Sequence, residues 1–161
     1  MVIVVMGVSG SGKTTVGSQL AQQLGWRFAD ADDYHSSGNV EKMRSGIPLT
    51  DADRAQWLHT LRSLISGWIA AQKNAVLACS ALKQTYREYL RVDEVIRLVY
   101  LKASENLLSQ RLLERQGHYM KRQMLESQLA TLEEPNDAIV INANGTPENI
   151  VGEIRKDLGL V

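Results

Sequence analysis

The feature that most constrains this chain is a glycine-rich stretch near its start, Gly7-Val8-Ser9-Gly10-Ser11-Gly12-Lys13-Thr14. Its spacing, G-x-x-x-x-G-K-[ST], is that of a P-loop, which holds phosphate groups. Glycines let the backbone approach an anion closely, so that successive N–H groups point into one concavity. An apolar run at 2–6 precedes the loop and a helical pattern follows at 13–24. These flanks disfavour the alternative, a simple Gly/Ser turn before a surface helix.

Two side chains in this stretch have expected roles of their own. Lys13 is expected to reach the β- and γ-phosphates of a nucleotide, and Thr14 to place its hydroxyl on Mg²⁺. The expected nucleotide-binding residues of this segment are Gly7, Val8, Ser9, Gly10, Ser11, Gly12, Lys13, Thr14 and Thr15.

Apolar runs alternate with amphipathic ones along the rest of the chain. Strands are expected at 2–6, 27–30, 74–79, 96–101 and 138–142, and helices at 13–24, 52–72, 83–91, 104–115, 122–133 and 147–158. Continuous apolar strands separated by helices predict a parallel sheet that is covered on both faces. The expected fold is therefore a three-layer α/β/α domain over 1–161, with a five-stranded parallel sheet. Ligands bind beyond the carboxyl ends of such strands.

Charge and cysteine content narrow the class of protein. The 161 residues carry 18 Lys and Arg and 18 Asp and Glu, which argues against a general nucleic-acid binder because such domains usually have a basic excess. Cys79 is the only cysteine, which excludes an intrachain disulfide and favours a reducing compartment. No stretch has the length of a membrane span, and the run at 2–6 is too short for a secretion signal. We therefore expect a soluble cytoplasmic protein.

Acidic residues follow the second expected strand, in Asp30-Ala31-Asp32-Asp33-Tyr34-His35. A carboxylate there can hold Mg²⁺ through water or accept a proton from a substrate hydroxyl. Asp30 and Asp32 would face the same side of an extended segment, whereas Asp33 would point away. The alternative is an acidic loop that caps a helix, but its position beside a P-loop favours the functional interpretation.

Residues 36–54 are polar and turn-rich, and no helix is predicted in this segment before the one that begins at 52. Thr50 or Asp51 is expected to cap that helix, with Asp53 in its first turn. Arg54 gains nothing from the helix dipole at this end. We expect its guanidinium to pair with a carboxylate that belongs either to the protein or to a substrate.

Two groups of cations follow later strands. Lys83 and Arg87 share a helix face and would present two positive charges near the carboxyl edge of the sheet, unless they only form a solvated basic face. Arg111 and Arg115 also share a face, which is typical of a lid whose cations stabilise the transferred phosphoryl group. The alternative is an exposed basic turn. His118 is either a substrate contact or a polar lid residue.

Together these motifs resemble those of the bacterial gluconate kinases. Besides the glycine loop, the resemblance rests on Asp30-x-Asp32 with His35, Asn39-Val40-Glu41-Lys42-Met43, Gly46-Ile47-Pro48-Leu49, Asp53-Arg54-x-x-Trp57-Leu58, Cys79-Ser80-Ala81-Leu82-Lys83 with Tyr86-Arg87, and Arg115-x-Gly117-His118-Tyr119. The matches span most of the chain, and those at 39–58 and 79–87 are the most specific. Asp33 and Ser36 depart from the family pattern, and neither removes a charge that the mechanism needs.

The resemblance implies an enzyme that phosphorylates the 6-hydroxyl of D-gluconate with ATP and Mg²⁺. It also implies the P-loop fold of nucleoside monophosphate and shikimate kinases, a mobile lid and, commonly, a homodimer. In this interpretation the segment at about 32–60 binds substrate and the segment at about 112–124 forms the lid. No nucleic acid or membrane partner is expected.

Residue pattern and resemblance together give one set of expected site residues. They are Lys13, Asp32 and Arg115 for catalysis, Arg111 for the nucleotide, Thr14 and Asp30 for the metal, and Asp32, His35, Arg54, Lys83, Arg87 and His118 for the substrate. One alternative is another small-molecule kinase, of the shikimate or nucleotide type. The other is a non-catalytic nucleotide switch, which the absence of an N-K-x-D stretch and the presence of lid arginines and an acidic loop disfavour.

Overall fold

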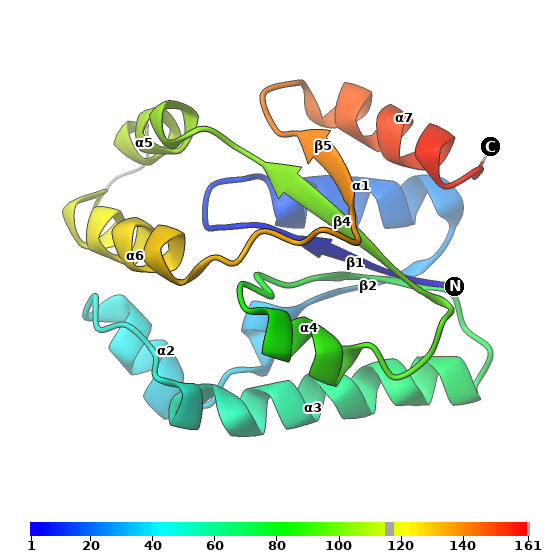
Figure 1. Cartoon of the computed structure of the whole chain (residues 1–161), viewed down its shortest axis with the longest axis horizontal. Coiled ribbons are helices and arrows are strands. Elements are labelled where there is room, and N and C mark those ends of the chain that lie inside the picture. The colour runs from blue at the N-terminus through cyan, green and yellow to red at the C-terminus, as the bar shows by residue number, and fades with distance from the viewer. Residues whose placement is uncertain (115–117, 161) are drawn as a thin grey trace.

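The predicted parallel sheet is the centre of the fold in a computed structural model, which describes the backbone of residues 1–114 and 118–160 and the side chains of 1–114, 122 and 124–160 (Figure 1). In this part of the chain the strands are β1 (Val2–Met6), β2 (Arg27–Asp30), β3 (Ala75–Ala78), β4 (Ile96–Lys102) and β5 (Ile139–Asn142). They form one five-stranded sheet in the order β2-β3-β1-β4-β5, and each neighbouring pair is parallel. The structure thus confirms the expected sheet.

Helices cover both faces of the sheet (Figure 1). Helices α1 (Lys13–Leu24) and α7 (Pro147–Asp157) lie on one face, and α3 (Asp51–Ala70) and α4 (Gln84–Leu90) lie on the other. The side chains of β1 alternate between the two sides: Ile3 and Val5 pack with α1 and α7, whereas Val4 packs with α3 and α4. This alternation gives one apolar core on each side of the sheet.

Four further helical elements gather at the end of the sheet where the strands finish (Figure 1). They are the 3₁₀ helix η1 (Ala31–Tyr34), α2 (Ser37–Arg44), α5 (Glu105–Leu113) and α6 (His118–Thr131). Val8, Leu108 and Leu125 belong to a third apolar cluster that joins the loop after β1 to α5 and α6. The functional edge of the sheet is therefore enclosed by helices.

Helix α2 is an element that the sequence pattern did not predict. Its only buried residue is Asn39, so no apolar periodicity marks it. Ser36 begins the helix, because its side-chain oxygen accepts a hydrogen bond from the N–H of Asn39. A serine cap in a polar segment is a weak signal by itself, so the sequence of residues 36–54 indicates turns rather than a helix.

The expected cap of α3 is confirmed. The Asp53 N–H donates to the Thr50 hydroxyl oxygen, and the Thr50 N–H donates to the Asp53 carboxylate, which completes a capping box. Thr146 caps α7, because its side-chain oxygen accepts a hydrogen bond from the N–H of Asn149, and Pro147 lies in the first turn. In the described part of the chain, no helix combines the length and apolar character that crossing a bilayer requires.

Candidate active site

The loop between β1 and α1 is shaped for an anion. A Cβ at Gly7 would lie 2.5 Å from the Ser11 hydroxyl oxygen and 3.1 Å from the Leu101 carbonyl oxygen, so only glycine leaves room for this turn. Gly12 stands immediately before α1 with a φ of 95°, in the left-handed region that favours glycine. The loop therefore leads directly into the N-terminus of α1, where backbone N–H groups and the helix dipole favour negative charge.

Two polar side chains of the loop are buried, and neither has a partner of the kind it needs among the described residues. Lys13 is only 9% exposed, and among the residues that the structure describes no carboxylate lies within 4.0 Å of its ammonium group. The buried Ser11 hydroxyl also has no hydrogen-bond partner in that part of the chain. Burial of a cation is costly unless a charge of opposite sign accompanies it. This arrangement fits a phosphate ligand.

Thr14 and Asp30, the two residues expected to bind a metal, lie in contact with each other. The Thr14 hydroxyl donates to the Asp30 carboxylate at 2.7 Å, at the carboxyl end of β2. Across the described residues, no group of three or more His, Cys, Asp or Glu side chains converges on a metal position. Mg²⁺ in kinases is commonly held by one or two protein ligands together with phosphates, so this pair fits Mg²⁺ bound with a nucleotide.

The conformation expected for the segment after Asp30 was wrong. Asp30 accepts a hydrogen bond of 2.9 Å from the N–H of Asp32 through its second carboxylate oxygen, and this contact begins the 3₁₀ helix η1. The segment therefore coils instead of remaining extended. Asp32 still reaches the cavity described next, and Asp33 is not among the residues that line it.

A cavity of about 230 Å³ adjoins the phosphate loop. Five segments supply its polar lining: Ser9 and Lys13 come from the loop and the start of α1, Asp32 and His35 from η1 and the residue after it, Arg54 from α3, Ser80 from the segment after β3, and Gln128 from α6. Met43, Leu49, Trp57, Leu82, Leu112 and Met124 add apolar surface. The cavity therefore combines a carboxylate and a guanidinium beside the expected phosphate site.

His35 is held rigidly in the wall of this cavity. Its ring stacks on Trp57 with a centroid distance of 4.3 Å and an interplanar angle of 12°. Trp57 is itself fixed, because its indole N–H donates to the Ala31 carbonyl at 2.7 Å. Burial lowers the pKa of His35, although the nearby Asp32 opposes this effect. His35 is therefore neutral at pH 7 and offers a hydrogen bond to a ligand rather than a charge.

Arg54 faces the cavity with most of its donors uncommitted. One guanidinium nitrogen, Nη1, donates to the Tyr86 hydroxyl at 3.3 Å. No carboxylate of the described residues lies within 4.0 Å of the Arg54 guanidinium. Of the two partners expected from the sequence, a carboxylate of the protein is thus not found in that part of the chain, which favours a carboxylate of the substrate.

Lys83 and Arg87 are not brought into the cavity, contrary to expectation. Lys83 donates to both oxygens of Asp51, at 2.9 and 3.3 Å. Arg87 is 7% exposed and donates to the carbonyl oxygens of Ala81, Leu82 and Glu133, at 2.7, 3.1 and 2.8 Å. Lys83 precedes α4 (Gln84–Leu90) as its cap residue with an extended backbone, so the expected shared helix face is not formed, and the fold uses both charges internally.

Arg111 lies against the phosphate loop. Its guanidinium donates to the carbonyl oxygens of Gly10 at 2.7 Å and Ala143 at 2.8 Å. The contact joins α5 to the loop and to the turn after β5, so Arg111 is already at the nucleotide side of the site. Arg115 and the side chain of His118 lie outside the described residues.

Gln128 is a site residue that the sequence did not indicate. The Ser9 N–H donates to its side-chain oxygen at 2.7 Å, and its side-chain nitrogen donates to the Ser9 hydroxyl at 3.1 Å. The two residues are 119 positions apart. A single glutamine in an amphipathic helix carries no motif, so only the tertiary structure reveals this link between α6 and the loop.

Known proteins share both the sequence and this arrangement. A protein-family profile described as an AAA domain matches residues 2–135. The gluconokinase of Gluconobacter oxydans is 47% identical over 156 aligned residues, which cover 94% of this chain and 88% of that protein. The chain belongs to the gluconokinase family. The crystal structure of a gluconokinase from Sinorhizobium meliloti is similar to it with a TM-score of 0.84 and 36% identity, over 98% of this chain and 94% of that one.

A second crystal structure supports the family assignment. A sugar kinase from Janibacter has a TM-score of 0.90 and 40% identity, over 99% of this chain and 95% of that one. The structural similarity to these two kinases therefore extends over nearly the whole length of the chain.

Proposed function

We propose that this protein transfers the γ-phosphoryl group of ATP to the 6-hydroxyl of D-gluconate, which yields 6-phospho-D-gluconate and ADP. The observation that carries the proposal is the cavity in which the Asp32 carboxylate and the Arg54 guanidinium adjoin Lys13. A sugar acid needs a cation for its carboxylate and an acceptor for the proton of its hydroxyl, and this cavity offers both. Relatives that are named gluconokinases support the same substrate.

On the nucleotide side, the backbone N–H groups of the loop and Lys13 bind the β- and γ-phosphates, and Arg111 holds the loop from the side of α5. Thr14 and Asp30 are the residues that would hold Mg²⁺. When bound, Mg²⁺ neutralises the charge that develops on the phosphate oxygens. Positioning and electrostatic stabilisation supply most of the rate, since phosphoryl transfer requires little covalent chemistry from the protein.

On the acceptor side, Arg54 pairs with the carboxylate of gluconate, and His35 offers a hydrogen bond from the cavity wall. Asp32 orients the 6-hydroxyl and accepts its proton as the phosphoryl group arrives. The volume of about 230 Å³ also favours a small acceptor. It falls below the range of about 300–1,000 Å³ that is usual for larger ligands, which disfavours a nucleotide as the acceptor.

The proposal extends to the organisation of the chain. Residues 1–161 form one kinase domain, in which about 32–60 binds the substrate and about 112–124 forms a lid that brings Arg115 and His118 to the site. The need for ATP as the donor favours a cytoplasmic location. A homodimer is proposed from the resemblance and predicts a mass in solution of twice the 17.9 kDa of the chain.

The direct test is an assay of the purified protein with Mg²⁺, ATP and D-gluconate. We expect ADP release that depends on gluconate, and a ³¹P NMR signal coupled to the two protons of a primary carbon, as phosphorylation at the 6-position requires. Shikimate, AMP and CMP serve as competing acceptors and should give at most a few per cent of this rate. ADP release with shikimate or a nucleotide, but not with gluconate, would overturn the proposal in favour of another small-molecule kinase.

A further inference from the structure

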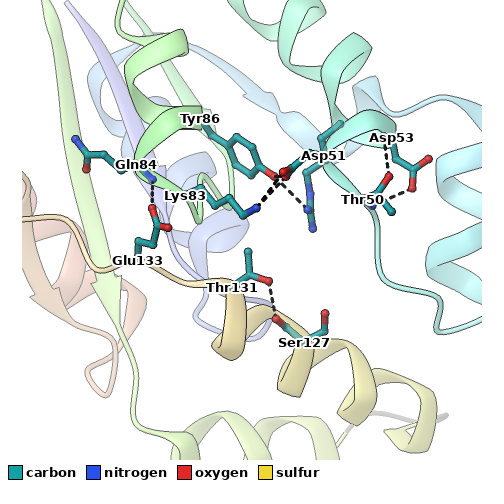
Figure 2. A network of polar contacts seen from close by, with 10 residues as sticks. Thr50, Asp51, Asp53, Lys83, Gln84, Tyr86, Ser127, Thr131 and Glu133 are labelled. Atoms are coloured by element: carbon teal, nitrogen blue, oxygen red, sulfur yellow. Dashed lines mark hydrogen bonds and ion pairs between the residues drawn. The ribbon is translucent and has the colours of Figure 1, made fainter.

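A chain of polar contacts joins the start of α3 to α4 and ends at Arg54. The Tyr86 hydroxyl donates to one carboxylate oxygen of Asp51, and Arg54 Nη1 donates to the same hydroxyl at 3.3 Å. Figure 2 shows Tyr86 and Lys83 of the α4 region reaching the Asp51 carboxylate from the side opposite to the Thr50–Asp53 cap. Of these residues, only Arg54 lines the cavity.

Each contact in this chain has a defined direction. A tyrosine hydroxyl has one proton, which Tyr86 gives to Asp51, so the lone pairs of its oxygen are left for Arg54. The hydrogen bond from Tyr86, followed by that from Lys83, lowers the pKa of Asp51. Burial raises the pKa of Tyr86, which keeps its proton in place. At neutral pH the hydroxyl therefore accepts from Arg54.

The ring of Tyr86 is anchored independently of its hydroxyl. Tyr86 is 7% exposed and belongs to the apolar core between the sheet and helices α3 and α4. Arg54 also lies over this ring, with its guanidinium carbon 5.7 Å from the ring centroid. A buried ring and a directed hydroxyl thus restrain a long, otherwise flexible side chain at the edge of the cavity.

We propose that Tyr86, fixed by Asp51, is a positioning residue that holds Arg54 ready for the carboxylate of the sugar acid. The inference rests on the proposed function, in which Arg54 binds that carboxylate. Tyr86 occupies one edge of the guanidinium through Nη1, and no other hydrogen-bond partner of Arg54 is found among the described residues, so its remaining N–H donors can make a two-point contact with the ligand. Restraining these donors before binding reduces the entropy that the complex would otherwise lose.

The test is Tyr86→Phe, which retains the buried ring and removes only the hydroxyl. We expect the KM for gluconate to rise about three- to tenfold, as the net loss of one ordinary hydrogen bond predicts. The kcat should change by less than about twofold and the KM for ATP should stay the same, because a loss confined to acceptor binding appears in that KM alone. An unchanged melting temperature within a few degrees shows that the fold is retained.

Tyr89 provides a matched control on the same helix. Its hydroxyl lies 3.3 Å from Nδ1 of His59 on α3, and the guanidinium carbon of Arg62 lies 4.7 Å from the centroid of its ring. Like Tyr86, Tyr89 thus has a polar contact at its hydroxyl and an arginine over its ring, but none of these residues lines the cavity. Tyr89→Phe should leave every kinetic constant unchanged, and a comparable rise in the KM for gluconate would show that Tyr86 has no special role.

A double-mutant cycle then separates positioning from a general structural role. In an Arg54→Ala background, Tyr86→Phe should not raise the KM for gluconate any further, because the residue that it positions is absent. An additive effect in that background, or an unchanged KM in Tyr86→Phe alone, would overturn the inference while the proposed function stands. If the wild-type protein does not phosphorylate gluconate at all, the proposed function fails, and the inference fails with it.

Discussion

At the scale of single residues, the charged side chains divide into those that the fold satisfies and those that it leaves for ligands. Both terminal guanidinium nitrogens of Arg87 and the Lys83 ammonium donate to protein oxygens, and only Nε of Arg87 lacks a partner among the described residues. By contrast, Lys13 is buried with no carboxylate of the described residues beside it, and Arg54 gives one hydrogen bond to a neutral hydroxyl. Spacing along a helix cannot separate these cases. It predicts that Lys83 and Arg87 share one face, but the carbonyl of Glu133 that Arg87 binds is 46 residues away.

Asp32 gives the clearest catalytic prediction for a single residue. Asp32→Asn removes the proposed proton acceptor and leaves the shape of the side chain, so we expect kcat to fall by about 10²–10⁴, the usual contribution of general base catalysis. The KM for ATP should change little, because Asp30 and not Asp32 contacts Thr14. A coupled ADP-release assay measures both constants.

Asp33 supplies the control for that prediction. It is exposed, adjacent in sequence and absent from the lining of the cavity. Asp33→Asn should therefore retain full turnover. Equal losses in the two variants would assign the effect to the net charge of η1 rather than to a proton acceptor.

At the scale of elements, the strands could be predicted from continuous apolar runs, and the long helices from the helical spacing of their apolar residues. The strands β1 and β2 and helix α1 match their expected ranges, and Trp57, Leu61, Ile65 and Trp68 form the buried stripe of α3. Helix α2 could not be predicted, since its stability comes from a cap and from contacts such as that of the Asn39 amide with the Asp53 carbonyl at 2.8 Å. Such contacts exist only once α3 is in place.

The capping box of α3 predicts a dependence of stability on pH. The hydrogen bond from the Thr50 N–H, together with that from Lys42, lowers the pKa of Asp53 from 3.8 to about 2. A carboxyl whose pKa is lower in the folded state stabilises the protein above its unfolded pKa and loses this effect as the pH falls through the folded value. Asp53→Asn should thus be less stable than the wild type at pH 7, with a difference that shrinks between pH 4 and pH 2. Urea unfolding at several pH values measures it; a constant difference would contradict the assignment.

The link between α6 and the phosphate loop gives a second prediction for an element. Gln128→Ala removes both hydrogen bonds to Ser9, so the loop loses a restraint on its anion-binding conformation. We expect kcat/KM for ATP to fall about three- to tenfold, the cost of losing one or two hydrogen bonds. Glu126→Gln, an exposed change on the same helix, should have no effect. Tighter ATP binding by Gln128→Ala would show instead that Gln128 competes with the phosphates for the Ser9 N–H.

At the scale of the whole molecule, the catalytic edge is held together by segments that are distant in sequence. The Glu133 N–H donates to the Leu82 carbonyl at 2.8 Å, and the Gln84 N–H donates to the Glu133 carboxylate at 2.8 Å (Figure 2). Arg87 adds its bond to the Glu133 carbonyl. These hydrogen bonds connect the residues just after α6 to the start of α4. The position of α6, which forms one wall of the cavity, therefore depends on contacts that lie outside the cavity.

Arg87 should therefore be essential for stability and unimportant for substrate binding. Arg87→Met leaves the carbonyl oxygens of Ala81, Leu82 and Glu133 without this donor, and we expect the free energy of unfolding to fall by about 2–4 kcal/mol. At a temperature where the variant remains folded, its KM for gluconate should equal that of the wild type. Urea unfolding and steady-state kinetics measure the two quantities.

Arg91, one turn further along, is the matched comparison. Its guanidinium pairs with Asp137 at 2.6 Å, but the two side chains are 39% and 40% exposed, so Arg91→Met should cost less than about 1 kcal/mol. The contrast tests whether carbonyl partners and burial, rather than positive charge alone, make Arg87 structural. A stable Arg87→Met variant with a raised KM for gluconate would reverse the assignment: the guanidinium would then turn toward the ligand in the complex, as the sequence pattern first indicated.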